Sequence, residues 1–472
     1  MIWGHYIGKF MREIKTPIIP LRPTFVKVKN QNHDLDYKAI CIFSAIGFFL
    51  DTDTYFLDEK VLPPATVNTI DNNGFWVDSK PWFTWHYTPH DTDLKAVVHQ
   101  FSNLFEKIVE KQSKNKEVIL PFSGGLDSRT QAVALHKIGA KVASYSYSFY
   151  NGYKESKISE KIAKKCDFSF AEFTVEKSYL WDKMSELASI NQCYSEFTHP
   201  RQMAVIEEIA QLGNNFSLGH WGDVLFDSDG YPENLSDKEL LKILKKKVLK
   251  KGGIELASAL WENWKLEGDF ETYLDKRISV LLTNIKIENT NAKLRAFKSL
   301  YWAPRWTSVN LSIFEDKHEI NLPFYEDAMC EFICTIPEKI LADRKVQIEY
   351  IKQTYPNVAK ILWQDARPFN LYNHHLAKFP YNFPYRVSNK FKRVFESLLG
   401  KKFVQRNWEL QFLGKENRQK LASHILSDDF NKEVDRELVK KIINLFYEND
   451  SVYYSHAVSM LLTLSVYFKK IK

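Results

Sequence analysis

Six consecutive residues, Ser123-Gly124-Gly125-Leu126-Asp127-Ser128, combine the side chains and the backbone freedom that an anion-binding loop needs. Two adjacent glycines permit positive φ angles and a close approach to a ligand, so that backbone N–H groups converge on an anion. Ser123 and Ser128 add hydroxyl donors. Asp127 would repel an anion unless a divalent cation lay between them. The loop therefore predicts a site for a polyphosphate and a metal ion.

The elements around this loop are expected to place it at the edge of a parallel sheet. The apolar run 117–122 predicts a buried strand, and the residues from Ser128 onward predict a helix. The alternation continues along the chain, with strands expected at 141–147, 169–175 and 215–218 and helices at 91–111 and 155–166. This order is typical of a parallel sheet, whose ligands bind at the carboxyl ends of the strands.

The loop is not a Walker loop, because the sequence contains no Gly-Lys-Ser or Gly-Lys-Thr. Instead, residues 123–128 resemble the pyrophosphate loop of the ATP pyrophosphatases, in the form found in asparagine synthetases and β-lactam synthetases. The alternative is a plain Gly-Gly turn between a core strand and a core helix. The resemblance implies ATP and Mg²⁺ as cofactors. It assigns ATP and its pyrophosphate to Ser123, Gly124, Gly125, Leu126, Asp127 and Ser128, with Tyr147 beside the adenosine.

A second segment, residues 219–226, resembles the second acidic loop of the same family. The residues that match the family pattern are Asp223, Leu225 and Phe226. Those that depart from it are His220, Trp221 and Val224, so that one expected acidic side chain is missing. The resemblance implies that Asp223 binds Mg²⁺ together with Asp127. A site poorer in carboxylates holds a divalent cation less tightly.

Two further residues, Glu155 and Lys345, fall where the family places side chains that act on the reaction. The resemblance implies that Glu155 takes a proton from the amine or orients it; the alternative is a glutamate that only favours the helix dipole. It also implies that Lys345 contacts the α-phosphate and the leaving pyrophosphate; the alternative is a solvated lysine. Asp227 and Asp229, just after the second loop, are interpreted as turn residues; the alternative is that they compensate for the missing acidic side chain near the metal.

The N-terminal part resembles the end of the glutaminase domain that precedes the synthetase domain in asparagine synthetases, through residues 62–71 and the aromatic residues that follow. That glutaminase uses a cysteine directly after the initiator methionine. This chain has Ile2 there and no cysteine before Cys41. We therefore expect that the chain does not hydrolyse glutamine by itself. Its nitrogen source is then ammonia or an amine, free or supplied by a separate protein.

Together these observations predict an α/β fold of the adenine nucleotide α-hydrolase kind, with a parallel sheet covered by helices on both faces. Three units are expected: a shortened β-rich segment (1–94), an ATP-binding core (95–235) and a mostly helical second half (236–472). The resemblance implies that a small-molecule or peptide carboxylate attacks ATP to give an acyl-adenylate and pyrophosphate, and that ammonia or an amine then forms an amide. The alternatives are another ligase on this fold, for a lactam, macrocycle, surface polysaccharide or natural product, and a non-catalytic nucleotide-binding descendant.

Composition limits the partners. The 472 residues are 44% hydrophobic and 26% charged, as in ordinary soluble proteins, and the longest apolar run, 39–50, is too short to span a bilayer. A net charge of +7 suits anionic substrates and does not indicate nucleic acid. Five scattered cysteines and no secretory signal favour the cytoplasm. The lysine-rich stretch 242–251 is interpreted as a solvated helix face. The basic amphipathic stretch 385–403 is interpreted as a domain-packing helix, with a membrane-surface contact as the alternative.

Overall fold

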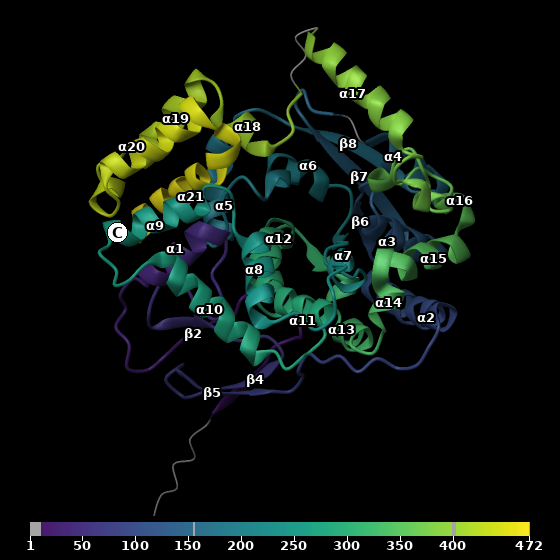
Figure 1. Ribbon diagram of the computed structural model, residues 1–472, viewed down its shortest axis with the longest axis horizontal. Helices are drawn as coiled ribbons and strands as arrows, with labels where there is room; N and C mark the ends of the chain where they lie inside the picture. Colours follow the sequence, from purple (N-terminus) through teal and green to yellow (C-terminus); the bar gives the residue numbers. More distant parts are fainter. Residues whose placement is uncertain (1–10, 154–155, 399–402, 472) are drawn as a thin grey trace, which may run out of the picture.

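The strand that precedes the Ser123 loop lies in the middle of a parallel sheet (Figure 1). The structure is a computed structural model that describes residues 11–153, 156–398 and 403–471. Among these residues, five parallel strands follow the order β10-β9-β6-β7-β8. They are β6 (Glu117–Pro121), β7 (Lys141–Phe149), β8 (Ser169–Val175), β9 (Asn215–Ser217) and β10 (Glu319–Asn321). Because β6 is central, its residues Val118 to Leu120 are fully buried.

Helices cover both faces of the sheet (Figure 1). On one face α2 (Leu94–Ser113), α3 (Leu126–Lys137) and α15 (Lys345–Thr354) pack against one another. On the other face α12 (Ser308–Glu315) packs against α5 (Tyr179–Ile190) and α6 (Ile206–Ala210). The ring of Phe314 in α12 lies 5.0 Å from that of Phe216 in β9. Helix α4 (Ser156–Lys165) packs on β7 and β8. The predicted α/β fold is confirmed.

The strand order reverses between β6 and β9. From β6 the chain adds β7 and β8 on one side, and it later adds β9 and β10 on the other. In doubly wound sheets ligands bind outside the carboxyl ends of the strands at this reversal. The Ser123 loop follows β6, and residues 219–226 follow β9. The topology therefore brings both predicted loops to one crevice.

The second half of the chain is mostly helical, as expected. A π-helical segment, Lys298–Thr307, leads from α11 into α12. The remaining helices are α7 (Gly222–Leu225), α8 (Asp237–Val248), α9 (Gly253–Asn263), α10 (Phe270–Asn284), α11 (Thr290–Phe297), α13 (Asp327–Ile333), α14 (Glu338–Leu341), α16 (Pro356–Ala359), α17 (Phe383–Leu398), α18 (Asn407–Phe412), α19 (Lys415–Ile425), α20 (Arg436–Asn444) and α21 (Ser451–Lys470).

The N-terminal segment is not wholly β-rich, because helix α1 (Tyr37–Ile46) lies within it. The Asp36 carboxylate caps its N-terminus by accepting from the Ala39 N–H, and Gly47 ends it with a φ of 84°. All residues from Ala39 to Ile46 are buried, so no polar face reveals a helical period. The strands of this segment are β1 (Arg12–Lys15), β2 (Phe25–Lys27), β3 (Glu59–Val61), β4 (Thr66–Ile70) and β5 (Trp76–Pro81).

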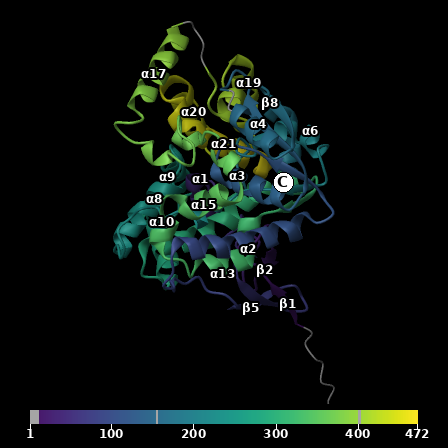
Figure 2. The same ribbon diagram turned by 90° about the vertical axis from the view of Figure 1, so that its right-hand side faces the viewer.

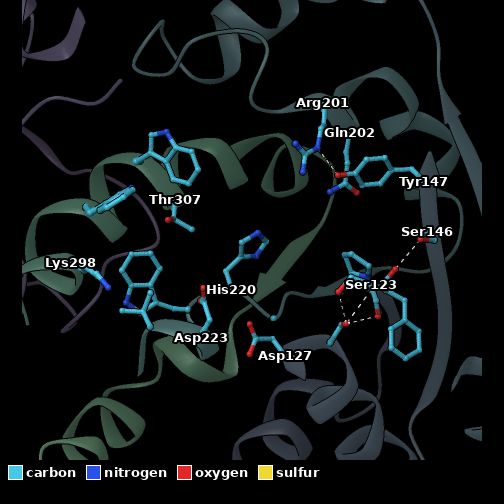
Figure 3. A pocket seen from close by; sticks show the side chains of 18 of the residues that line it. Ser123, Asp127, Ser146, Tyr147, Arg201, Gln202, His220, Asp223, Lys298 and Thr307 are labelled. Atoms are coloured by element: carbon cyan, nitrogen blue, oxygen red, sulfur yellow. Dashed lines mark hydrogen bonds between the residues drawn. The ribbon is translucent and has the colours of Figure 1, made fainter. Parts of the chain in front are cut away.

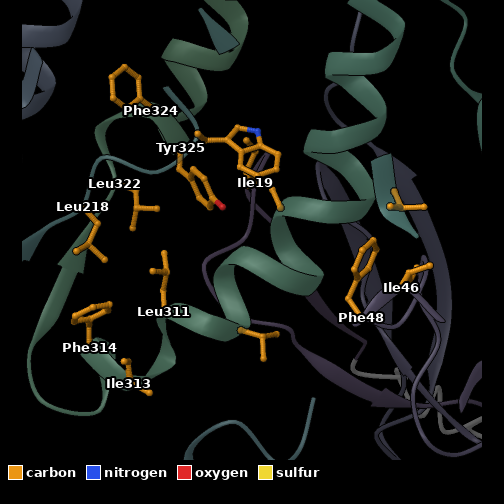
Figure 4. Close-up of a cluster of buried hydrophobic side chains, with 14 of the residues drawn as sticks. Ile19, Ile46, Phe48, Leu218, Leu311, Ile313, Phe314, Leu322, Phe324 and Tyr325 are labelled. Carbon is orange, nitrogen blue, oxygen red and sulfur yellow. The ribbon is translucent and has the colours of Figure 1, made fainter. Parts of the chain in front are cut away.

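One connected hydrophobic core joins the N-terminal segment to the rest of the chain (Figure 4). Ile19, Ile46 and Phe48 belong to the same cluster as Leu311 and Tyr325. Helix α1 also packs against α9 and α21. The N-terminal segment is therefore built into the main body. The boundaries at 94/95 and 235/236 stay predictions.

Helix α17 projects from the body of the molecule (Figure 2). Phe379, Phe383 and Phe391 are 74%, 54% and 72% exposed. Of these three rings only that of Phe391 lies within 385–403, and most apolar side chains of that stretch lie outside the described ones, so its interpretation as a domain-packing helix stays a prediction. Over the described ranges, no helix has the length and apolar character needed to cross a membrane.

Candidate active site

A cavity of about 650 Å³ opens where the loops after β6 and β9 meet (Figure 3). Ser123, Asp127 and Ser128 line it from the first loop, and His220 and Asp223 from the second. Its other lining residues include Ser146, Tyr147, Arg201, Gln202, Trp221, Val224, Lys247, Lys298, Trp302, Trp306 and Thr307. This volume is typical of a small-molecule site. Five of the ten residues that the sequence assigns to the site therefore share one cavity: Ser123, Asp127, Ser128, Tyr147 and Asp223.

The first loop is held in place by its own hydroxyl groups and by a distant segment. The Ser123 and Ser128 hydroxyl oxygens lie 3.0 Å apart, and the Ser123 N–H donates to Ser128 Oγ over 3.2 Å. The Gly124 N–H donates to Gln364 Oε1 over 3.0 Å. Gln364 must therefore move before that N–H can bind a phosphate. Leu126 is buried in the core, so only its backbone is free to face a ligand.

Asp127 is the most constrained charge in the cavity. Its Oδ1 accepts from Gln347 Nε2 over 3.1 Å and from the Arg344 guanidinium. Burial raises the pKa of Asp127, Arg344 opposes that rise, and the nearby Asp223 adds to it. Arg344 thus forms an ion pair with this carboxylate, a role that the sequence did not suggest. In the sequence, the only indication of this role was that Arg344 directly precedes Lys345.

The second loop approaches Asp127 so closely that a glycine is required. A Cβ atom at Gly222 would lie 2.3 Å from Asp127 Oδ1, well inside contact distance. Trp221, just before it, has a φ of 78°, in the left-handed region that non-glycine residues seldom adopt. Its indole N–H donates to Ser299 Oγ over 3.0 Å and fixes this turn. The turn places Asp223 beside Asp127 (Figure 3).

His220 stands where the sequence departs from the family pattern. Its ring lies above the two aspartates in Figure 3, in the middle of the cavity. His220 is exposed within the cavity, so its ring can face a bound ligand.

The donor set fits a magnesium ion that completes its coordination with phosphates and water. Across the described residues, no group of three or more His, Cys, Asp or Glu side chains is placed to hold a metal ion. Mg²⁺ is commonly bound by one or two carboxylates together with the oxygens of a nucleotide. Asp127 and Asp223 supply two such carboxylates. Bound there, the ion would neutralise negative charge on the phosphates.

The end of the cavity beside β7 has the polar groups expected near a nucleoside. Tyr147 lies there, and its phenol oxygen accepts from Arg201 Nε over 2.6 Å. The Arg201 guanidinium also lies 5.6 Å from the centre of the Tyr147 ring. Ser146 Oγ donates to the Phe122 carbonyl over 3.0 Å. Tyr147 therefore lines the site as the resemblance implies, and its contact with adenosine stays a prediction.

The opposite end of the cavity is basic and aromatic. Lys247 and Lys298 donate to the two oxygens of Asp229, over 3.0 and 2.8 Å. Burial raises the pKa of Asp229, but Lys298 and Lys247 outweigh it and hold that pKa below its usual value. Trp302 and Trp306 line this end from the π-helical segment. Such segments often occur at functional sites.

These residues correct two interpretations. The stretch 242–251 is not simply a solvated face, because Lys247 turns into the cavity. Asp229 is more than a turn residue, because it holds two lysines. The sequence could not show this, because the two lysines come from α8 and from the segment after α11.

The two residues predicted to act on the reaction are not seen at the cavity. Glu155 lies outside the described residues. The Lys345 ammonium donates to the Lys339 carbonyl over 3.2 Å, and Lys345 does not line the cavity. Its neighbour Arg344 instead reaches Asp127. The roles of Glu155 and Lys345 stay predictions.

Replacing Gly222 by alanine is expected to weaken Mg²⁺-dependent ATP binding. The new methyl group would push Asp127 away from its position beside Asp223, at a cost of about 1–3 kcal/mol, which is about a fivefold to 150-fold loss of affinity. Calorimetric titration with ATP, with and without Mg²⁺, measures this. Ser228→Ala, in the same segment, is the control and should bind as the wild type does. Equal affinity of Gly222→Ala and wild type for MgATP would contradict the placement of the two carboxylates.

Comparison with known proteins agrees with the geometry. A protein-family model described as asparagine synthase matches residues 100–406, more than half of the chain. No curated protein sequence matches. Among solved structures, NMN synthetase from Francisella tularensis is 13% identical over 44% of this chain and 92% of that one, with a TM-score of 0.22, too low to support any inference. The family match shows that this chain belongs to the asparagine synthase family, whose members are ATP-using ligases that form amides.

Proposed function

We propose that this chain is a carbon–nitrogen ligase that activates a carboxylate as an acyl-adenylate and transfers the acyl group to ammonia or an amine. One observation carries the proposal: the loops after β6 and β9 meet in a single cavity and place Asp127 and Asp223 side by side. A pyrophosphate loop and a pair of carboxylates are the two parts that ATP cleavage between the α- and β-phosphates needs. Family membership supports the same reaction class.

The cavity offers a separate place for each reactant. The pyrophosphate of ATP would lie against the N–H groups and hydroxyls of Ser123 to Ser128, at the N-terminus of α3. The adenosine would lie towards Tyr147. The carboxylate substrate would enter from the end lined by Lys298, Trp302 and Trp306. Lysines attract an anion, and tryptophan faces favour a substrate with an apolar or ring-shaped surface. We therefore propose a carboxylate larger than a small amino acid.

In the first step a carboxylate oxygen attacks the α-phosphorus, and the bond to the oxygen that bridges the α- and β-phosphates breaks. Pyrophosphate leaves with that oxygen. In the second step the amine nitrogen attacks the acyl carbon, AMP leaves, and the nitrogen loses a proton. Negative charge develops on the pyrophosphate in the first step, and preorganised donors such as Ser123, Ser128 and the loop N–H groups oppose it. Glu155 is proposed as the group that accepts the proton or orients the amine.

The nucleotide product distinguishes this reaction from other uses of ATP. We expect that incubation with MgATP, ammonia and a panel of carboxylates yields AMP and an amide for at least one carboxylate. Chromatography of the nucleotides and mass spectrometry of the acyl product measure both. ADP as the stoichiometric product would contradict the adenylation mechanism, because it requires cleavage at the γ-phosphate. Asp127→Asn is the control for contaminating ATPases and should form no amide.

A matched pair of variants shows which cation stabilises the negative charge that develops on the leaving pyrophosphate. We favour Arg344, because its guanidinium reaches Asp127, which lines the cavity, whereas the Lys345 ammonium donates to a backbone carbonyl; neither of the two cationic side chains lines the cavity itself. A charged donor used only in the transition state contributes more to rate than to affinity. Its loss typically costs about a hundred- to a thousandfold in rate. Arg344→Ala should therefore release pyrophosphate slower by about that factor.

The affinity of Arg344→Ala for MgATP should stay close to that of the wild type, because two effects oppose each other. The variant loses a cation near the phosphates, and it also loses the group that competes with Mg²⁺ for Asp127. Lys345→Ala should lose less than about threefold in rate, which is the scatter of ordinary surface changes. A large loss of rate in Lys345→Ala and a small one in Arg344→Ala would instead assign the stabilisation of the leaving pyrophosphate to Lys345.

A further inference from the structure

A second cavity, of about 400 Å³, lies beside the reaction cavity and has no part in the chemistry described above. Four chain segments form it: residues 196–201, the connection 249–251 between α8 and α9, the start of α18, and α21. We call it the basic cavity, after its four cationic side chains. These are Arg201, Lys250, Lys251 and Arg406.

The charge in the basic cavity is unbalanced. Glu196 is the one acidic side chain that lines it, and its oxygens are already used. Glu196 accepts from the Thr198 N–H over 2.8 Å and from the Ser459 hydroxyl, and His199 Nε2 lies 3.1 Å away. Burial raises the pKa of Glu196, but His199 and the hydroxyl and amide donors outweigh it and hold the pKa below its usual value. Four cations therefore face one carboxylate that is occupied.

Lys250 shows the imbalance most clearly. Within the described part of the chain, its ammonium makes no hydrogen bond or close ion pair; it lies 5.2 Å from the ring of Trp306 and 5.8 Å from that of Trp302. Burial lowers the pKa of Lys250. Lys250 is half-buried and keeps its N–H donors, so an anion in the cavity would accept hydrogen bonds from it.

A second donor in the basic cavity also lacks a partner. Trp408 lines it, is 8% exposed, and its indole N–H is buried without a hydrogen-bond partner in the parts of the chain that the structure covers. Indole N–H and ammonium groups donate and do not accept. The free polar groups of the cavity therefore call for a ligand rich in acceptor oxygens. They disfavour an amine, which would bring a further positive charge.

The basic cavity and the reaction cavity are separated by little more than one layer of side chains. Arg201 lines both of them. The ring of Trp306, which lines the reaction cavity, lies 5.1 Å from the ring of His199, which lines the basic one. A group bound in the basic cavity would therefore lie next to the end of the reaction cavity that we assign to the carboxylate substrate.

We propose that the basic cavity binds an anionic group, a phosphate or a carboxylate, next to the reacting carboxylate. Two sources supply this chemistry: a distal anionic group of the carboxylate substrate itself, or a separate anion. The first source rests on the proposed function, whereas anion binding as such does not. Lys250 is the central ligand, and Trp408 would add a neutral donor once its buried N–H turned towards the anion.

Inorganic phosphate is the probe. The full-length protein is first saturated with Mg²⁺ and a non-hydrolysable ATP analogue, so that the pyrophosphate loop is occupied, and phosphate binding is then measured by calorimetry. We expect Lys250→Met to weaken phosphate binding by about tenfold or more, since a hydrogen bond to a charged group is lost. Methionine keeps an apolar stem against the two tryptophans. Lys246→Met, on the exposed side of α8, is the matched control and should bind phosphate as the wild type does.

A second variant, Trp408→Phe, keeps the ring and removes the N–H, and it should also weaken phosphate binding. No phosphate binding by the wild type under these conditions, or equal binding by Lys250→Met and Lys246→Met, would overturn the proposal. Either result would leave the ligase activity untouched, so failure here is distinct from failure of the proposed function.

Steady-state kinetics with a carboxylate that the protein accepts as substrate distinguish the two sources of the anionic group, the substrate itself and a separate anion. If the substrate supplies the anionic group, phosphate competes with the carboxylate, and Lys250→Met raises KM with little change in kcat. If the anion is separate, phosphate changes the rate without competing, and this effect is absent from Lys250→Met. Both outcomes support the basic cavity as an anion site and differ only in the source of the anion.

Discussion

The close approach of Gly222 to Asp127 is the constraint on which the rest of the site depends. The two residues follow adjacent parallel strands, β6 and β9, at the point where the strand order reverses. Bringing two backbone loops this near places Asp223 beside Asp127; burial raises the pKa of Asp127, and Asp223 adds to that rise. Two carboxylates this close repel each other unless a cation lies with them. Arg344 supplies a cation at Asp127.

This constraint explains why the protein is organised in layers around one crevice. Helix α3 presents its N-terminus to the cavity, α15 supplies Gln347, the residue directly before α15 is Arg344, and the π-helical segment supplies Lys298 and two tryptophans. Each group comes from a different part of the chain. The single connected core, which includes α1, holds these parts in fixed positions relative to one another. The end of the cavity beside Tyr147 and the basic, aromatic end then face each other across His220 (Figure 3).

The local features of the site could be predicted from the sequence. Buried strands next to glycine loops, and helices with a regular apolar face, can be recognised from the spacing of their hydrophobic residues in the sequence alone. Ser123, Asp127, Ser128 and Asp223 follow from their loops, and the structure brings them into one cavity. Their roles in binding ATP and metal stay predictions.

What the sequence could not show depends on long-range packing. Helix α1 was missed because all its residues from Ala39 to Ile46 are buried and carry no helical period. Arg344 and Lys345 are neighbours, and only the left-handed backbone at Arg344, with φ of 57°, turns its guanidinium to Asp127. Lys247 was misread as solvated, because its partner Asp229 and its neighbour Lys298 lie on other elements.

The most direct test of the central claim is carboxylate-dependent exchange of labelled pyrophosphate into ATP. The exchange is measured without ammonia or amine, so that only the first step operates. If the cavity forms an acyl-adenylate, label enters ATP in the presence of Mg²⁺ and a competent carboxylate, and Asp127→Asn abolishes it. Amide formation with AMP release but no exchange would contradict a reversible adenylate. No exchange and no amide across a broad panel of carboxylates would contradict the ligase itself.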